Sequence, residues 1–244
     1  MGLISAPAAP AATCTWSQGW VKAENEKAGT SGWDGDIPLR FSADFSRRTT
    51  MSRVEGYFDR TSVGCGEKAK LTIVGARTAD LLVYRIGYYN GKGARLIETI
   101  QSGKSFNATS NTPPGQYLIK LKSPGRVSTF VPLMVRGQSK SEITFVSSVL
   151  TWQAYNQWGG TSLYKGANGK RETKATTVTF NRPYDGDGAG QFRYMEQPLV
   201  QMMEQLGLDI NYITDIDLDK QSVINSPSIV LVGIVSSGPS QCER

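Results

Sequence analysis

The feature that constrains the fold most is a change of hydrophobic pattern near residue 137. From about Arg53 to Arg136, short alternating apolar runs are separated by turn-forming stretches such as 64–66 and 113–115. Short, regularly spaced strands of this kind predict an all-β unit, an immunoglobulin-like β-sandwich. We expect its strands at residues 54–58, 69–74, 81–86, 96–100, 117–121 and 129–135. The hairpin at 85–95 is expected to carry exposed tyrosine at its tip, as decoration of an edge strand.

Beyond residue 141 the pattern becomes typical of an α/β domain. Strands are predicted at 143–149, 173–180, 209–214 and 228–232, with a helix between the second and the third. Pro198 lies in the first turn of that helix and Gly207 is its expected C-terminal cap. Five apolar residues share the face that we expect to be buried: Met195, Leu199, Met202, Met203 and Leu206. This order of elements predicts a parallel sheet with right-handed crossovers.

The predicted domain organisation follows from these two patterns. Residues 1–50 form an extended lead-in, residues 51–137 the β-sandwich, and residues 141–244 the α/β domain. The lead-in has little periodicity, and we expect its tryptophans, Trp16, Trp20 and Trp33, to pack on the following domain. Within it, residues 23–33 are predicted to form a loop with turns at Gly29 and Gly32.

Composition excludes several classes of function. The 244 residues include no histidine, which removes Ser-His and Cys-His nucleophile pairs and every metal site that needs imidazole. A metal would have to be held by oxygen ligands. The net charge of +6 is scattered without a basic block, so we expect no nucleic-acid binding. No apolar run approaches the roughly 20 residues of a membrane span.

The compartment stays open between secreted and cytoplasmic. Cys14 and Cys65 could form a disulfide in an exported protein, but spacing alone does not decide the pairing. The first dozen residues end in small residues, as a signal peptide does, yet they lack a basic start and a long apolar centre.

The aromatic stretch 151–164 is the strongest candidate for a functional segment. It reads Thr-Trp-Gln-Ala-Tyr-Asn-Gln-Trp-Gly-Gly-Thr-Ser-Leu-Tyr and follows a predicted strand, where a loop is expected. Loops at the carboxyl ends of parallel strands often hold ligands, although such aromatic residues can equally fill a corner of the core. The predicted strand ends would place Tyr155, Tyr184 and Asp215 on the same rim of the sheet.

Two acidic clusters are weaker candidates. Asp185-Gly-Asp187-Gly resembles part of a calcium loop but lacks the remaining ligands, so a glycine-rich turn is the simpler interpretation. For Asp215, Asp217 and Asp219, helix capping explains one or two of the three.

Several segments resemble the N,N-dimethylformamidase large (beta) subunit-like family. They are the aromatic stretch 151–164, Phe180-Asn-Arg-Pro-Tyr184, Glu196-Gln-Pro-Leu-Val200, Gly207 to Leu218, Glu55 to Ser62 and Arg85 to Arg95. The resemblance covers roughly residues 24–233 in consistent order. It implies a β-sandwich followed by an α/β domain that resembles class I glutamine amidotransferases.

The resemblance also implies an amidohydrolase whose iron is held by two tyrosinates and a glutamate. Carried over to this sequence, the tyrosine ligands are Tyr155 and Tyr184, with Tyr164 as the substitute. The implied substrate is a small amide, and the chain would act as a homo-oligomer or a small accessory subunit. The alternative interpretation is a secreted or surface carbohydrate-binding β-sandwich module, with Trp152 and Trp158 as its aromatic platform.

The C-terminus departs from the family pattern. After residue 232 the family continues Gly-His-x-Glu-aromatic-Trp-Ser, whose glutamate is the expected third ligand, whereas this chain reads Gly233-Ile-Val-Ser-Ser-Gly-Pro239. A family-like run encoding His-Arg-Glu-Phe-Trp-Ser becomes Ile-Val-Ser-Ser-Gly-Pro when its first base is lost. We therefore expect a frameshift, an incomplete, C-terminally truncated α/β domain, no bound iron and no activity in this chain.

The frameshift hypothesis makes a prediction about the DNA sequence downstream of the codon for Gly233. The neighbouring reading frame should encode a His-x-Glu-aromatic-Trp-Ser run, and sequencing of the locus checks this. An intact frame with no such run in the adjacent frame would contradict it.

Overall fold

The computed structural model describes residues 14–39, 52–137, 140–219, 224, 226–231 and 241–243. Over these residues the protein is a mixed α/β structure with several sheets, many strands and few helices, and its sheets do not close into a barrel. Residues 232–240, which carry most of the unusual C-terminal run, lie outside the described part. Within the described part, no helix has the length and apolar character needed to cross a membrane.

The first half of the chain forms two sheets. The larger has the order β2-β8-β7-β4-β5, and the smaller has the order β1-β3-β6. All six strands predicted in this half are confirmed within a few residues, and two very short ones, β2 and β6, were not foreseen. Their bounds are β1 Glu55–Phe58, β2 Ser62–Val63, β3 Lys68–Val74, β4 Asp80–Ile86, β5 Ala94–Ile100, β6 Ser105–Asn107, β7 Gly115–Lys122 and β8 Thr129–Val135.

Alternation along the strands gives the five-stranded sheet two buried faces. Because successive side chains point to opposite faces, Leu81 and Val83 of β4 enter a core shared with the small sheet. Tyr84 and Ile86 of the same strand enter a second core on the other face. Strand β7 is buried at seven of its eight positions for the same reason.

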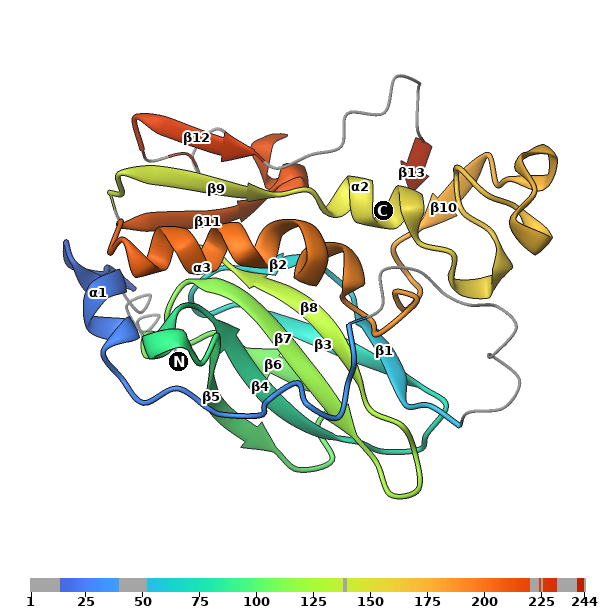
Figure 1. Ribbon diagram of the computed structural model, residues 1–244, viewed down its shortest axis with the longest axis horizontal. Helices are drawn as coiled ribbons and strands as arrows, with labels where there is room; N and C mark the ends of the chain where they lie inside the picture. The colour runs from blue at the N-terminus through green and yellow to red at the C-terminus, as the bar shows by residue number, and fades with distance from the viewer. Residues whose placement is uncertain are drawn as a thin grey trace, which may run out of the picture.

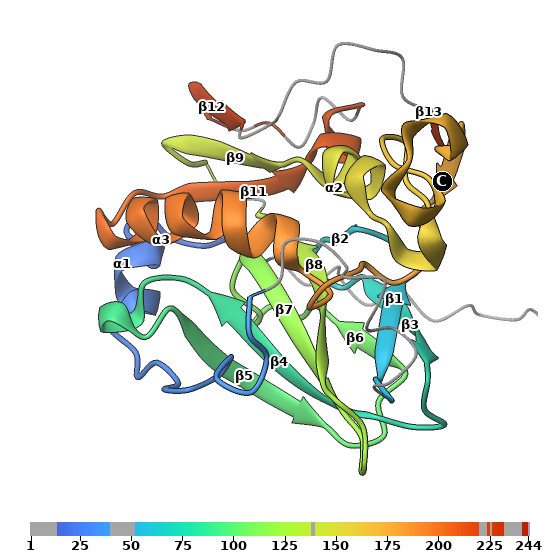
Figure 2. The same ribbon diagram turned by 45° about the vertical axis from the view of Figure 1, so that its right-hand side comes forward.

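The second half builds a parallel sheet on that outer face. Its order is β11-β9-β12, with β9 Ile143–Ser147, β11 Ile210–Thr214 and β12 Ser228–Leu231, and both pairings are parallel as predicted. The predicted strand at 173–180 is reduced to β10 Thr177–Thr179, which pairs with β13 Gln241–Glu243. Figures 1 and 2 show helix α3 between the parallel sheet and the five-stranded sheet.

The helices correct two expectations. Helix α1 Trp20–Asn25 overlaps the predicted loop, although Trp20 and Trp33 are buried as expected. Helix α2 Val149–Tyr155 occupies the start of the aromatic stretch, where we expected a loop. A π-helical turn, η6 Phe192–Glu196, leads into α3 Gln197–Gln205. Short 3₁₀ turns are η2 Tyr89–Gly91, η3 Trp158–Gly160, η4 Ala167–Gly169, η5 Arg171–Thr173 and η7 Asp215–Asp219.

Helix α3 has the predicted ends but buries a different face. Pro198 lies in its first turn, and Gly207 takes the left-handed conformation, with φ +72°. Val200, Met203 and Glu204 face the core, while Met202 and Leu206 are 51% and 67% exposed, so the predicted buried face was wrong for these two. Helix α3 is rotated about its axis relative to the predicted orientation, because the buried Glu204 side chain contacts a cationic partner on β4.

That partner is Arg85, and the pair is fully buried. Nη2 of Arg85 lies 2.5 Å from Oε1 of Glu204, and both side chains have no exposed surface. Tyr212 of β11 donates to Oε1 of Glu204 at 2.6 Å, and Asn25 of α1 donates to Oε2 at 2.9 Å. Four elements from both halves of the chain therefore meet at one carboxylate.

A tyrosine at the tip of the hairpin belongs to this buried network and does not face solvent. Tyr89 is fully buried, and its hydroxyl accepts from Arg85 and donates to Glu24. The expectation of exposed tyrosine at the tip was therefore wrong for Tyr89. A Cβ at Gly87 would lie 2.2 Å from Oε2 of Glu204, which explains the glycine at this position.

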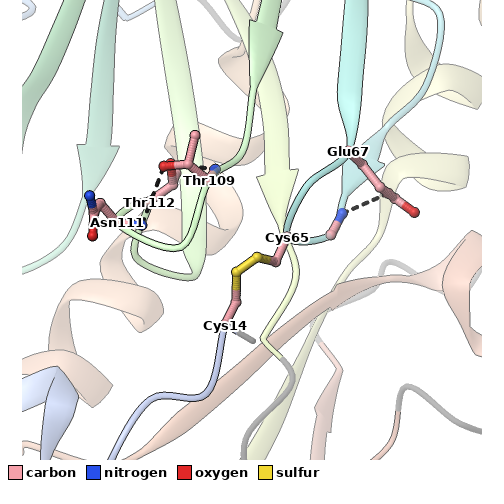
Figure 3. Close-up of a disulfide and its surroundings, with 7 residues drawn as sticks. Cys14, Cys65, Glu67, Thr109, Asn111 and Thr112 are labelled. Atoms are coloured by element: carbon pink, nitrogen blue, oxygen red, sulfur yellow. Dashed lines mark hydrogen bonds between the residues drawn. A yellow bond between two sulfur atoms is a disulfide. The ribbon is translucent and has the colours of Figure 1, made fainter. Parts of the chain in front are cut away.

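A disulfide joins the start of the described chain to the small sheet. Cys14 and Cys65 are bonded, with their Cα atoms 5.9 Å apart. Figure 3 shows the bond beside Glu67 and the turn formed by Thr109 and Thr112. The carboxylate of Glu67 accepts the Gly64 N–H at 2.7 Å, so the loop that carries Cys65 is held on both sides.

The buried pair predicts a large and selective loss of stability. Arg85→Met leaves the Glu204 carboxylate buried without its cation, so the free energy of unfolding should fall by about 3–5 kcal/mol. Chemical denaturation measures it. The matched control is Arg77→Met, an exposed arginine, which should change the free energy by less than about 0.5 kcal/mol. Equal, small effects of the two substitutions would contradict the assignment.

Candidate functional site

The candidate site lies at the carboxyl ends of the parallel strands. Strand β9 ends at Ser147 and leads through Ser148 into α2, while β11 ends at Thr214 and is followed by Asp215. Ligands of parallel α/β sheets gather at this edge. The polar side chains that meet here are therefore the ones to examine for chemistry.

A buried carboxyl, Glu196, reaches this edge from the π-helical turn. Its side chain is 1% exposed, and Oε1 accepts the Ser148 N–H at 3.1 Å and the indole N–H of Trp152 at 2.8 Å. Burial raises the pKa of Glu196 to about 8, although these donors and the Ser147 hydroxyl oppose the rise. At neutral pH Glu196 is therefore predominantly a neutral acid. Single π-turns of this kind are frequent at functional sites.

Asp215 is a second carboxyl with a perturbed pKa at the same edge. It accepts the Leu150 N–H at 3.1 Å, and burial raises its pKa to about 6. Its negative charge also contributes to the raised pKa of Glu196. The edge thus holds two neighbouring carboxyl groups whose pKa values differ by roughly two units.

A small cavity of about 40 Å³ lies beside Trp152, between the two halves of the chain. Trp152 and Tyr184 form part of its wall, with their rings edge to face at 6.2 Å. The other apolar walls are Tyr57, Phe58, Val131, Pro132, Leu133, Val149 and Phe180, and the polar side chains are Asp59, Arg60, Thr61, Gln116 and Arg182. A space of this size and character suits a molecule of a few heavy atoms with apolar groups.

A polar hollow adjoins the cavity. It has a volume of about 290 Å³ and shares Asp59, Arg60, Thr61 and Phe180 with the cavity wall. Arg136, which also lines it, contacts Glu67 at 2.8 Å and Asp217 at 3.3 Å. The cavity therefore borders on a wider, polar space in which charged groups are already paired.

Arg182 and Asn156 fix the segments that carry the aromatic side chains. The Arg182 guanidinium donates to the carbonyl oxygens of Asn156 at 2.9 Å and Trp158 at 3.1 Å. Asn156 donates to the carbonyl of Pro183 at 2.9 Å and accepts the Asp185 N–H at 3.0 Å. Residues near 156 and 184 therefore run side by side. Both residues stood in recognised motifs, but no local signal predicted this clamp.

The two predicted tyrosine ligands pack in different aromatic clusters. Tyr155 stacks on Tyr164, with ring centroids 4.2 Å apart, whereas Tyr184 packs on Trp152. Burial and the neighbouring Tyr164 raise the pKa of Tyr155, which opposes formation of a tyrosinate in the metal-free chain. Ligation of one metal by Tyr155 and Tyr184 stays a prediction.

The iron site that the family resemblance implies consists of two tyrosinates and one carboxylate, which differs from a cluster of His, Cys, Asp and Glu side chains. Among the described residues, no three His, Cys, Asp or Glu side chains form a group that could hold a metal ion. The rings of Tyr155 and Tyr184 pack on different aromatic partners, and we derive no chemical step through iron.

The acidic clusters have structural partners. Asp187 pairs with Arg193 at 2.6 Å, and Asp185 accepts the Gln157 N–H at 2.9 Å. Asp217 accepts hydrogen bonds from the backbone N–H and the hydroxyl of Thr214, at 3.0 and 2.8 Å. These bonds agree with the turn and capping interpretations of the two clusters. The side chain of Asp219 lies outside the described part.

Comparison with known families decides the assignment. The family model for the C-terminal part of N,N-dimethylformamidase beta subunit-like proteins matches residues 80–234. The chain belongs to this family. The match includes β4, the aromatic stretch, Tyr184, Glu196 and β11, so the cavity wall is largely built from residues of the family region. A search of the curated proteins found no match.

The carbohydrate-binding alternative finds no support in this site. Trp152 is 4% exposed and donates its indole N–H to Glu196, so it offers no open face to a sugar. Trp158 is half-buried, and its indole N–H donates to Glu55 at 3.1 Å. An aromatic sugar platform needs exposed rings, and this pair lacks them.

The buried acid predicts a pH dependence of stability. The pKa of Glu196 is about 8 in the folded protein against an ordinary 4.5, so between these values the folded state holds a proton that the unfolded state has released. The free energy of unfolding therefore falls as pH rises through this window, by at most about 1.4 kcal/mol per pH unit. Glu196→Gln, which mimics the neutral acid, should remove this part of the slope.

Denaturation at pH 5, 6, 7 and 8 measures the difference between the variant and the unaltered chain. The control is Glu26→Gln, an exposed carboxyl, which should leave the slope unchanged. Identical slopes for Glu196→Gln and the unaltered chain would contradict the raised pKa.

Proposed function

We propose that this chain carries the small-amide site of an N,N-dimethylformamidase-like amide hydrolase. The observation that supports it is the cavity beside Trp152 and Tyr184, at the carboxyl edge of the parallel sheet in a chain of this family. The apolar walls suit the alkyl groups of a small amide, and Gln116 and Arg182 supply polar groups at the wall. Hydrolysis would add water to the carbonyl carbon and break the C–N bond, giving formate and dimethylamine from N,N-dimethylformamide.

The chain's own residues would bind and orient this substrate. Trp152 and Tyr184 meet edge to face and would hold the methyl groups by apolar contact. Walls drawn from both halves of the chain would exclude bulk water and so strengthen polar contacts with the amide. Two carboxyls near the cavity, Glu196 and Asp215, have raised pKa values and could hold protons at neutral and mildly acidic pH.

We propose iron as a cofactor of the full-length family and none for this chain by itself. Iron would supply a Lewis acid that polarises the amide carbonyl. Tyr155 and Tyr184 are the proposed ligands from this region, and the described residues supply no carboxylate cluster to accompany them.

The finer architecture and assembly are also proposals. We infer an immunoglobulin-like sandwich over residues 51–137 after the lead-in of residues 1–50, and over 141–244 a partial domain like those of class I glutamine amidotransferases. The face-to-face sheets and the parallel order β11-β9-β12 support this inference. Because the matched family is described by a beta subunit, we propose that the chain works in a homo-oligomer or as an accessory subunit.

The test compares this chain with the product of the restored reading frame. Both are titrated with N,N-dimethylformamide by NMR, assayed for dimethylamine release and analysed for iron. We expect millimolar binding to both proteins in the cavity, because a ligand of five heavy atoms has little binding energy. Dimethylamine release and bound iron are expected for the restored product.

A bulky substitution in the cavity wall provides the control. Val149→Trp should fill the space and abolish binding, whereas Leu150→Trp, at a neighbouring residue outside the wall, should not. A folded, iron-loaded restored protein that neither binds nor hydrolyses small amides would contradict the proposed function.

A further inference from the structure

Glu196 lies directly behind the wall of the cavity. Its Oε1 accepts the indole N–H of Trp152, and the indole ring packs edge to face with Phe192 and Tyr184, at 5.8 and 6.2 Å between ring centroids. Trp152 lines the cavity, while Glu196 does not. The carboxyl therefore reaches the proposed ligand site through one hydrogen bond to a wall residue.

A carboxyl at this position is costly for folding alone. It is 1% exposed, and its Oε2 is enclosed without a hydrogen-bond partner in the described part of the chain. Burying a polar oxygen without a partner destabilises the folded state, and an apolar side chain of similar size would not incur this penalty. A role in the candidate site would explain why a glutamate occupies this buried position.

We propose that Glu196 is a positioning residue of the small-amide site, which holds the Trp152 indole against Tyr184 and so fixes the shape of the cavity. This inference rests on the proposed function for its ligand. Without an acceptor at Glu196, the indole N–H of Trp152 would be buried and unsatisfied. The ring would then turn toward water, and the nearest space is the cavity itself.

Two substitutions separate positioning from packing. Glu196→Gln keeps a carbonyl oxygen as the acceptor, whereas Glu196→Leu keeps the volume and removes the acceptor. The readouts are the ¹H–¹⁵N signal of the Trp152 indole, assigned through Trp152→Phe, and the apparent Kd for N,N-dimethylformamide. We expect Glu196→Gln to retain both, and Glu196→Leu to shift the signal and weaken binding at least tenfold.

Gln197→Leu is the matched control. It removes the next polar side chain, whose Oε1 is also buried without a partner but makes no bond to Trp152, so it should leave both readouts unchanged. An unchanged indole signal in Glu196→Leu, or equal loss of binding in Glu196→Leu and Glu196→Gln, would overturn the proposal.

Hydrogen exchange of the Trp152 indole N–H in the unaltered chain is a second measurement that needs no variant to fold. Protection of this proton supports the contact with Glu196, and exchange at the unprotected rate overturns it. If the unaltered chain binds no amide, the proposed function fails. The indole signal and its exchange still decide whether Glu196 positions Trp152.

Discussion

The fold depends on the buried ion pair between Arg85 and Glu204. Arginine and glutamate placed far apart in the sequence meet without solvent, and each oxygen of Glu204 also accepts a neutral donor. Burying such a pair is expensive, and it is tolerated because the geometry is bidentate and the remaining hydrogen-bonding groups are satisfied. The pair fixes how α3 lies on the five-stranded sheet, since either charge left alone would be far less stable.

The position of α3 in turn determines the candidate site. The π-helical turn that begins this helical segment brings Glu196 to the carboxyl ends of β9 and β11. The cavity forms where that edge meets β1, β7 and β8, and its wall therefore needs both halves of the chain. Seen in this way, the ionic network and the cavity are two consequences of one packing arrangement around α3 (Figure 1).

Sequence reasoning reached the strands and the parallel sheet because their signals are local. Alternation and turn residues indicated the six longer strands, and Pro198 and Gly207 marked the ends of α3.

Sequence reasoning failed where contacts between residues distant in the sequence determine which side chains are buried. Tyr89 was expected at the surface because nothing in the hairpin reveals its contact with Glu24, which lies 65 residues earlier in the chain, and Met202 was expected in the core because the burial of Glu204 could not be foreseen. Glu196 stood in a recognised motif, but its hydrogen bond to Trp152 depends on tertiary packing. Tyr155 and Tyr184 were proposed as ligands from the family resemblance, which stays a prediction, and their rings pack on different aromatic partners.

The central claim is that a small amide occupies the cavity between Trp152 and Tyr184. The most direct measurement is the set of intermolecular NOEs from the methyl protons of bound N,N-dimethylformamide to the protein. The account predicts cross-peaks to the ring protons of Trp152 and Tyr184 and to the methyl groups of Val149. Cross-peaks confined to residues away from this wall, in a protein saturated with the amide, would contradict it.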